Sequence, residues 1–162
     1  IMEPRSQTFV ENYASEQLWV DADQDRIEQV LTNLISNASK YSGKGNTVDV
    51  TAEVQAGRLW VSVTDHGIGI SQEDQKNLFT SFFRASNKET RAVPGTGLGL
   101  VIARSLIELH DGEVFIESEY GTGTSVKFYL PDYLEEPPVP TMEDEFPHDV
   151  IPFDRKPNPR AA

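Results

Sequence analysis

Alternating apolar and polar positions predict two β-hairpins. Residues 47–55 (TVDVTAEVQ) and 58–65 (RLWVSVTD) are rich in β-branched and aromatic side chains that alternate with polar ones, and the Ala-Gly pair between them suits a tight turn. Residues 113–119 and 124–130 form a second pair of this kind, joined through Tyr-Gly-Thr-Gly. We therefore expect at least four strands in antiparallel pairs.

Two segments have the spacing of helices instead. From about Asp23, a helix N-cap residue, to Lys40, apolar residues recur on one side. They are Ile27, Val30, Leu31, Leu34, Ile35 and Ala38. A second helix begins in the glycine cluster at 95–99 and runs to about Leu109, where Gly112 can close it. Strands and helices together predict an α/β sandwich, one mixed and mostly antiparallel sheet covered on one face by about three helices.

The remaining segments differ from each other. Residues 71–94 show no regular pattern, and so long an irregular stretch inside a compact domain predicts a mobile lid. Residues 131–162 hold eight of the ten prolines, none of the eleven glycines and a net charge of −5. We expect a domain at 1–131 and a disordered or extended acidic tail at 132–162, either solvated or docking a partner.

Composition excludes several classes of function. The net charge of −12 argues against a surface for nucleic acid or an anionic membrane. The chain has no cysteine, which excludes disulfides and thiolate metal sites and suits a reducing, cytoplasmic compartment. No apolar run is long enough to span a bilayer, and the start of the chain reads like the middle of a longer protein, whose other parts could carry an anchor.

One flank of the first helix is polar in an unusual way. Asn33, Asn37 and Lys40 lie together beside the apolar stripe, and Tyr41 lies nearer its edge. An asparagine oxygen suits Mg²⁺, a lysine suits phosphate, and a tyrosine ring suits a nucleotide base. The alternative is a solvated helix face that ends in an asparagine and lysine cap.

Two glycine-rich segments add to this flank. Residues 65–70 (DHGIGI) end a strand and offer the Asp65 carboxylate as an acceptor, with glycines that let backbone approach a ring; a plain turn is the alternative. Residues 95–100 (GTGLGL) begin a helix, where free N–H groups favour anions. This segment has neither the lysine of a Walker A loop nor the preceding strand of a Rossmann fingerprint.

The order and spacing of four segments carry more information than any one of them. DQDRIEQVLTNLISNASKYS, VTDHGIGIS, LFTSFFR and GTGLGLVIAR resemble the N, G1, F and G2 boxes of the ATP-binding catalytic domain of bacterial sensor histidine kinases. The resemblance covers about residues 8–131, including a closing hairpin ESEYGTGTSVKFYLP. It implies a Bergerat-type ATP fold with ATP between the first helix and a lid at about 71–96.

The resemblance also implies roles for single residues. Asn37 would hold Mg²⁺, while Asn33 and Lys40 would lie along the phosphates. Tyr41 would flank the adenine, and Asp65 would accept a hydrogen bond from its amino group. Gly67, Gly69 and Ile70 would line the base, and Thr124 would assist Asp65 through water.

The lid would supply the remaining contacts. Phe82 and Phe83 would anchor it, unless they are plain core residues. Arg84 would reach the terminal phosphate, unless it is an exposed lid arginine, and Arg91 is a weaker candidate for that charge. The residues that would let the lid close and meet the phosphates are Gly95, Thr96, Gly97, Leu98, Gly99 and Leu100. Histidine at 66, where the family often has asparagine, is expected to be tolerated.

Asn33 also separates branches of the wider superfamily. Chaperones, topoisomerases and mismatch-repair ATPases carry a glutamate there as general base, and an amide cannot serve as one. We therefore expect Asn33, Lys40 and Arg84 to support transfer of the γ-phosphoryl group rather than hydrolysis.

The acceptor would be a histidine on a separate helical hairpin, with a response regulator downstream. None of His66, His110 and His148 lies in a suitable context. The alternatives are a catalytically silent nucleotide-binding module and a serine-directed kinase of the same fold.

Overall fold

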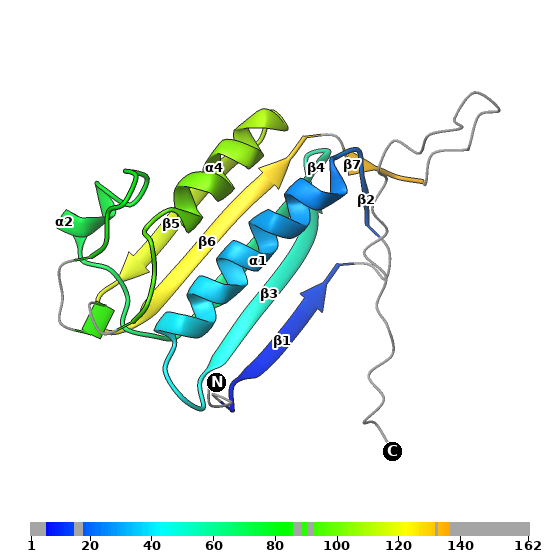
Figure 1. The fold of residues 1–162 in the computed structure, drawn as a ribbon. Helices are drawn as coiled ribbons and strands as arrows, with labels where there is room; N and C mark the ends of the chain where they lie inside the picture. The colour runs from blue at the N-terminus through cyan, green and yellow to red at the C-terminus, as the bar shows by residue number, and fades with distance from the viewer. Residues whose placement is uncertain (1–5, 15–17, 86–88, 91–92, 132, 137–162) are drawn as a thin grey trace, which may run out of the picture.

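The computed structural model describes residues 6–14, 18–85, 89–90, 93–131 and 133–136, and its centre is a five-stranded sheet (Figure 1). The strands are β1 (Thr8–Tyr13), β3 (Thr47–Gln55), β4 (Arg58–Asp65), β5 (Glu113–Glu119) and β6 (Gly123–Leu130). Their order across the sheet is β1-β3-β4-β6-β5. β1 is parallel to β3, and every other pair is antiparallel. Both predicted hairpins and the α/β sandwich class are confirmed.

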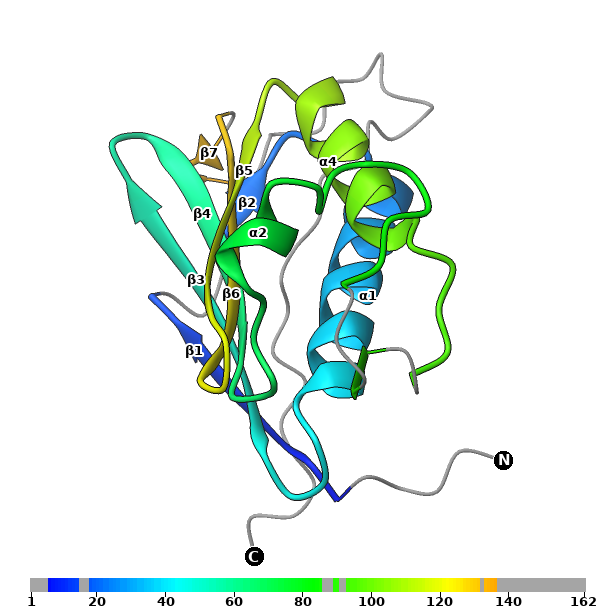
Figure 2. The same cartoon turned by 90° about the vertical axis from the view of Figure 1, so that its left-hand side faces the viewer.

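Two long helices cover one face of this sheet (Figure 2). They are α1 (Gln24–Tyr41) and α4 (Gly99–Leu109), and the described residues add the four-residue α2 (Gln72–Gln75). The Asp23 side chain accepts a hydrogen bond from the N–H of Arg26, as expected of the predicted N-cap. At the end of α4 the N–H of Gly112 donates to the carbonyl of Ile107 over 3.0 Å. The limits of both helices agree closely with the sequence-based expectation.

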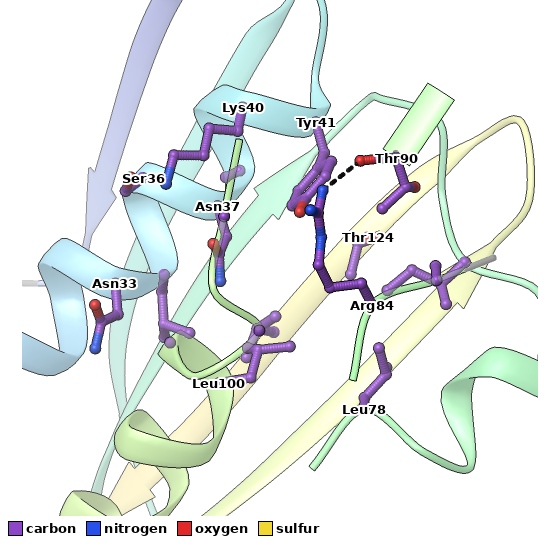
Figure 3. A pocket seen from close by; sticks show the side chains of 18 of the residues that line it. Asn33, Ser36, Asn37, Lys40, Tyr41, Leu78, Arg84, Thr90, Leu100 and Thr124 are labelled. Atoms are coloured by element: carbon purple, nitrogen blue, oxygen red, sulfur yellow. Dashed lines mark hydrogen bonds between the residues drawn. The ribbon is translucent and has the colours of Figure 1, made fainter. Parts of the chain in front are cut away.

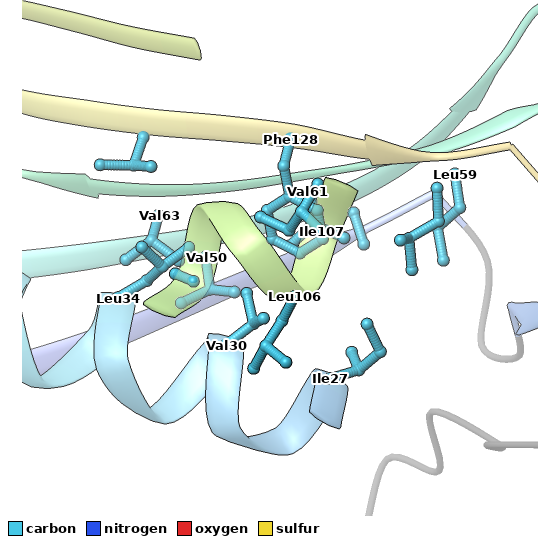
Figure 4. Close-up of a cluster of buried hydrophobic side chains, with 14 of the residues drawn as sticks. Ile27, Val30, Leu34, Val50, Leu59, Val61, Val63, Leu106, Ile107 and Phe128 are labelled. Atoms are coloured by element: carbon cyan, nitrogen blue, oxygen red, sulfur yellow. The ribbon is translucent and has the colours of Figure 1, made fainter. Parts of the chain in front are cut away.

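The core lies between the helices and the sheet (Figure 4). Its most buried side chains include Val30 and Leu34 from α1, Ile107 from α4, and Val63 and Phe128 from the sheet. Burial of this stripe fixes the rotation of α1 about its own axis. The polar flank of α1 is thereby held at the rim of the core.

Two short strands extend the domain beyond its predicted limit. β2 (Trp19–Val20) pairs with β7 (Tyr133–Leu134), which corrects the expectation that the tail begins at 132. Tyr133 packs against the core, because β7 closes the end of the sandwich where β6 stops. Residues 137–162 lie outside the described part of the chain. β1 was also not predicted, since five of its six residues are exposed and its pattern does not differ from that of a linker.

The segment expected to be irregular does contain one regular turn. Ser71 caps α2 through its side chain, and the side-chain amide of Gln75 donates to the carbonyls of Ile70 and Ser118, each over 2.8 Å. These bonds fix the first part of the expected lid to β5. Among the described residues, neither long helix combines the length and apolar character needed to cross a membrane.

Candidate functional site

A cavity of about 320 Å³ opens between α1, the sheet, the lid segment and the start of α4 (Figure 3). It gathers all but one of the residues that the sequence assigned to a nucleotide. Those that line it are Asn33, Asn37, Lys40, Tyr41, Asp65, Gly69, Ile70, Phe83, Arg84, Gly95, Thr96, Gly97, Leu98, Gly99, Leu100 and Thr124. Its volume lies at the lower end of the range typical of small-molecule sites.

Asp65 stands at the end of β4 with only 6% of its surface exposed. Burial raises the pKa of its carboxyl to about 6, although backbone N–H groups of Gly67 and Thr124 and the nearby His66 act in the opposite direction. The Gly67 N–H donates to Oδ1 over 2.9 Å. Asp65 therefore presents a preorganised acceptor to the cavity, held in place by backbone rather than by another charged side chain.

Thr124 supports this carboxyl differently from the expectation. Its backbone N–H bonds to Asp65, while its hydroxyl pairs with the Ser118 hydroxyl at 2.9 Å. The direct backbone bond follows from strand register, since Asp65 and Thr124 are opposite each other on β4 and β6. The main chain of Thr124 thus supports the carboxyl directly, while its predicted assistance through water stays a prediction.

Gly67 is the one assigned residue that does not line the cavity. A β-carbon there would lie 2.0 Å from the carbonyl oxygen of Tyr41, so the glycine allows the loop after β4 to touch the end of α1. The N–H of Ile68 donates to that same carbonyl over 3.3 Å. Gly67 therefore holds the Asp65 carboxylate through its N–H group, and its contact with a base stays a prediction. Gly69 lines the cavity with φ +63° and lies similarly close to the backbone of Glu119.

The two asparagines of α1 face the beginning of α4. A β-carbon on Gly99 would lie 3.6 Å from the Nδ2 atom of Asn37 and 3.9 Å from the side chain of Asn33. The Nδ2 atom of Asn33 is buried and has no hydrogen-bond partner. Both amides thus lie close to the first turn of α4, whose N-cap residue Leu98 offers no side-chain cap. Unsatisfied N–H groups at such a helix start favour an anion.

A metal ion in this cavity would take some of its oxygen donors from a bound polyphosphate. The described residues contain no cluster of three His, Cys, Asp or Glu side chains that could hold one. Asn37 lines the cavity, and an amide oxygen combined with phosphate oxygens and water is the kind of donor set that Mg²⁺ accepts. The residues present therefore fit Mg²⁺ brought with a polyphosphate. They do not form a protein cage for a metal alone.

Arg84 is engaged by the lid itself. Its Nη2 group donates to the carbonyl oxygen of Thr90 over 2.7 Å (Figure 3). The same group donates to the carbonyl oxygen of Val93. Its Nε atom is buried without a partner. The guanidinium thus lies at the cavity, as predicted, while two of its bonds hold the lid backbone. Arg91, the weaker candidate, lies outside the described residues.

The two phenylalanines before Arg84 have different environments. Phe83 lines the cavity, but the side chain of Phe82 is 73% exposed, which corrects the expectation that it anchors the lid. Phe82 has φ +65°, and its N–H donates to the carbonyl of Gly97 over 3.2 Å. This bond turns the Phe82 side chain outward. Gly97, with φ +74°, permits the contact because a β-carbon there would lie 2.6 Å from the carbonyl oxygen of Phe83.

Comparison with known proteins places this cavity in a family. The model of histidine kinase-, DNA gyrase B- and HSP90-like ATPases matches residues 22–134. The chain belongs to this family. Within it, the sensor histidine kinase WalK of Bacillus subtilis is 43% identical over 132 residues, which are 79% of this chain and 21% of WalK. This chain spans about a fifth of the curated relatives that it matches.

Solved structures agree with this assignment. The catalytic domain of histidine kinase ThkA is 32% identical, with a TM-score of 0.68 over 79% of this chain and 82% of that domain. A structure of ThkA in complex with the response regulator protein TrrA is 32% identical, with a TM-score of 0.65 over 79% of this chain and 35% of that one. The resemblance to the ATP-binding catalytic domain of sensor histidine kinases is confirmed.

Sequence reasoning did not find the apolar floor of this kinase cavity. Val63, Ile116 and Val126 line it from the sheet, and Leu78 lines it from the lid segment. The three sheet residues are apolar core-side positions of their strands close to Asp65, so strand alternation carried a signal for them. Leu78 begins the segment LFTSFFR, but the sequence analysis assigned it no contact with the cavity.

Neither described histidine belongs to the cavity. His66 bonds the Asp49 carboxylate at 2.7 Å on the surface. The Nε2 atom of His110 accepts the N–H of Asp23, and its Nδ1 atom bonds the carbonyl of Leu106. His110 therefore connects the end of α4 to the start of α1 and is held as a structural residue. His148 lies outside the described residues.

Proposed function

We propose that this domain binds Mg·ATP in the cavity and transfers the γ-phosphoryl group to a histidine on a separate helical hairpin. One observation carries the proposal: among the described residues that line the cavity, Asp65 is the only carboxylate. Asn33 and Asn37 occupy the helix face opposite the anion-binding start of α4, and amides cannot take a proton from water. A γ-phosphoryl group held there is protected from general-base hydrolysis, and remains available to an incoming nucleophile.

The proposed pose follows the chemistry of each wall. The adenine lies over the apolar floor, beside Tyr41, with its amino group donating to Asp65. The triphosphate runs toward the first turn of α4, between Lys40 and Arg84. Asn37 and the phosphate oxygens would hold Mg²⁺, which neutralises charge that builds up on the phosphates during transfer. Arg84 would contact a phosphate through the N–H groups that do not hold the lid, since its bonds to the carbonyls of Thr90 and Val93 use Nη2 alone.

The partners are proposed on the same basis. The chain matches only about a fifth of WalK, so the acceptor hairpin is assigned to another part of a longer parent or to a split partner. The ThkA–TrrA complex supports a response regulator as the downstream partner. We place the domain in the cytoplasm, where ATP is available, with any membrane anchor in another part of the parent.

Supplying an acceptor tests the proposal. The domain is incubated with Mg·ATP and a sensor-kinase hairpin that carries one acceptor histidine, and the phosphorylated product is treated with acid and with base. An acid-labile, base-stable phosphate that is lost in a His→Ala hairpin supports histidine transfer. An acid-stable phosphate would indicate a serine-directed kinase. Nucleotide binding without any transfer would leave only a silent nucleotide-binding module.

A further inference from the structure

Figure 2 shows the sheet with α1 and α4 on one side. The strand residues that face the other side include an aromatic cluster that the nucleotide site does not use. Trp60 on β4, Phe115 on β5 and Tyr129 on β6 lie on neighbouring strands. The ring centroids are 5.0 Å apart for Trp60 and Tyr129, 5.8 Å for Trp60 and Phe115, and 6.4 Å for Phe115 and Tyr129. Phe115 is 40% exposed, although the neighbouring strand residues on the other face are packed into the core. Three rings in contact at a solvent-facing sheet surface form a platform for another apolar group.

The charges around these rings favour a basic partner. Two cations are already engaged: Arg58 lies over the Tyr129 ring at 4.3 Å, and Lys127 lies over Trp60 at 4.7 Å. Lys127 is also 3.6 Å from a carboxylate oxygen of Glu53. Glu113 and Glu117 flank Phe115 on the edge strand, both exposed, and neither has an ionic partner among the described residues.

We propose that residues 155–160 of this same chain, Arg-Lys-Pro-Asn-Pro-Arg, bind this surface. We call the surface the aromatic patch, and define it as Trp60, Tyr129, Phe115, Glu113 and Glu117. All three basic residues that follow Pro131 fall within 155–160, together with Pro157 and Pro159. Proline rings pack well on aromatic side chains, as in other proline-rich recognition, and the basic side chains pair with the two free glutamates.

The path of the chain permits this contact. β6 ends at Leu130 opposite Leu59, one residue beyond the Trp60 and Tyr129 pair, and β7 follows at once. Residues 137–154 can extend for roughly 60 Å at 3.3 Å each, whereas five strands at about 4.8 Å spacing are only about 20 Å wide. A tethered segment has an effective concentration of the order of mM, so individually weak contacts are enough.

A nitroxide at one position in the tail tests the contact in the full chain. The sequence has no cysteine, so Asn158→Cys gives a single attachment site. We expect loss of amide signals in ¹⁵N spectra around Trp60, Phe115 and Tyr129, with the signals of α1 retained. The double variant Glu113→Lys with Glu117→Lys should restore those signals. A charge-matched control on exposed positions of α1, Asp25→Lys with Glu28→Lys, should not.

Several results would overturn the proposal. Intact signals on β4, β5 and β6, or a loss spread evenly over the domain, would mean that the segment does not bind the aromatic patch. The same conclusion holds if the signals stay lost in the double variant Glu113→Lys with Glu117→Lys. In a further experiment, nitroxide-carrying protein without ¹⁵N is mixed with ¹⁵N protein that carries no nitroxide. Signal loss in that mixture would mean that the segment binds the patch of a second copy. None of these measurements requires nucleotide, so they are independent of the proposed kinase activity.

Discussion

The two walls of the nucleotide cavity are built in different ways. On one side, α1 and the sheet hold Asp65 with backbone N–H groups from two directions, and the floor is made of core residues. On the other, the lid segment holds Arg84 through carbonyls of its own backbone and turns Phe82 outward with 73% of its surface exposed. In the first wall Asp65 is already held in position without a ligand. In the second wall Arg84 is bonded to lid carbonyls, and a phosphate can compete with these carbonyls for the guanidinium.

This difference suggests a division of tasks. Base recognition costs little rearrangement, because the acceptor at Asp65 is already desolvated and oriented. In the proposed pose Arg84 is shared between a phosphate and the two lid carbonyls that its Nη2 group holds, which limits the interaction energy left for the phosphate. Substitutions in the sheet wall should therefore have larger effects on affinity than substitutions in the lid wall.

Asp65→Asn should have the largest effect. The amide places donors beside the adenine amino group, and a buried mismatch of this kind costs about 1–3 kcal/mol. ATP affinity should fall by about 5-fold to 150-fold, and the preference for ATP over GTP should disappear. Calorimetric titration with both nucleotides measures this, with the exposed Asp25→Asn as the control. An unchanged preference would show that Asp65 is only a strand-end residue.

Asn37→Ala should follow in size. Removing the proposed Mg²⁺ ligand should weaken Mg·ATP binding by at least about 1.4 kcal/mol, which is tenfold. Titrations with Mg²⁺ and with EDTA separate the metal-dependent part from the rest. The exposed Asn12→Ala on β1 provides a matched amide outside the cavity. Equal losses with and without Mg²⁺ would remove Asn37 from the metal site.

Arg84→Gln should have a smaller effect, confined to the terminal phosphate. Because the wild-type guanidinium is shared with two lid carbonyls, the net loss for ATP should be only about threefold to tenfold, or ~0.7–1.4 kcal/mol. ADP affinity should hardly change, and the exposed Arg26→Gln should change neither. A loss for ATP greater than that of Asp65→Asn would reverse the proposed division between the walls.

The smallest effect concerns pH. The pKa of Asp65 is raised to about 6 by burial, so its carboxyl takes up a proton as pH falls through that value. A protonated carboxyl accepts poorly from adenine and can donate to the carbonyl of guanine. The ratio of ATP to GTP affinity should therefore decline as pH falls through about 6. Protonation of the triphosphate is common to both nucleotides and cancels in the ratio. In Asp65→Asn the ratio of ATP to GTP affinity should not change with pH.

The sequence predicted the two walls unequally. The regular wall follows from periodicity: α1, α4 and both hairpins were located because burial on one side imposes a repeat. Asp65 and the α1 flank were found because their residue types are unusual beside a core. Local pattern could not place Phe82 outside or attach Arg84 to Thr90 and Val93, since those positions depend on irregular backbone and contacts between loop segments. Edge strand β1 and the pairing of β2 with β7 were not predicted for a similar reason. Neither buries enough side chains to produce a periodic apolar pattern in the sequence.

The central claim is that Asn33 withholds a general base from a site that otherwise binds Mg·ATP. Asn33→Glu tests it most directly, since the side chain lies against the same first turn of α4. General-base assistance is typically worth about 10²–10⁴-fold, and a glutamate in surroundings not arranged for it should give less. Phosphate release at saturating Mg·ATP and transfer to an acceptor hairpin are measured together, with Ser36→Glu on the same cavity wall as the control.

The account predicts that phosphate release without acceptor rises in Asn33→Glu and transfer to histidine falls, while Ser36→Glu does not raise release. If release stays flat in Asn33→Glu while nucleotide occupancy is confirmed, Asn33 does not decide between hydrolysis and transfer, and the central claim is contradicted.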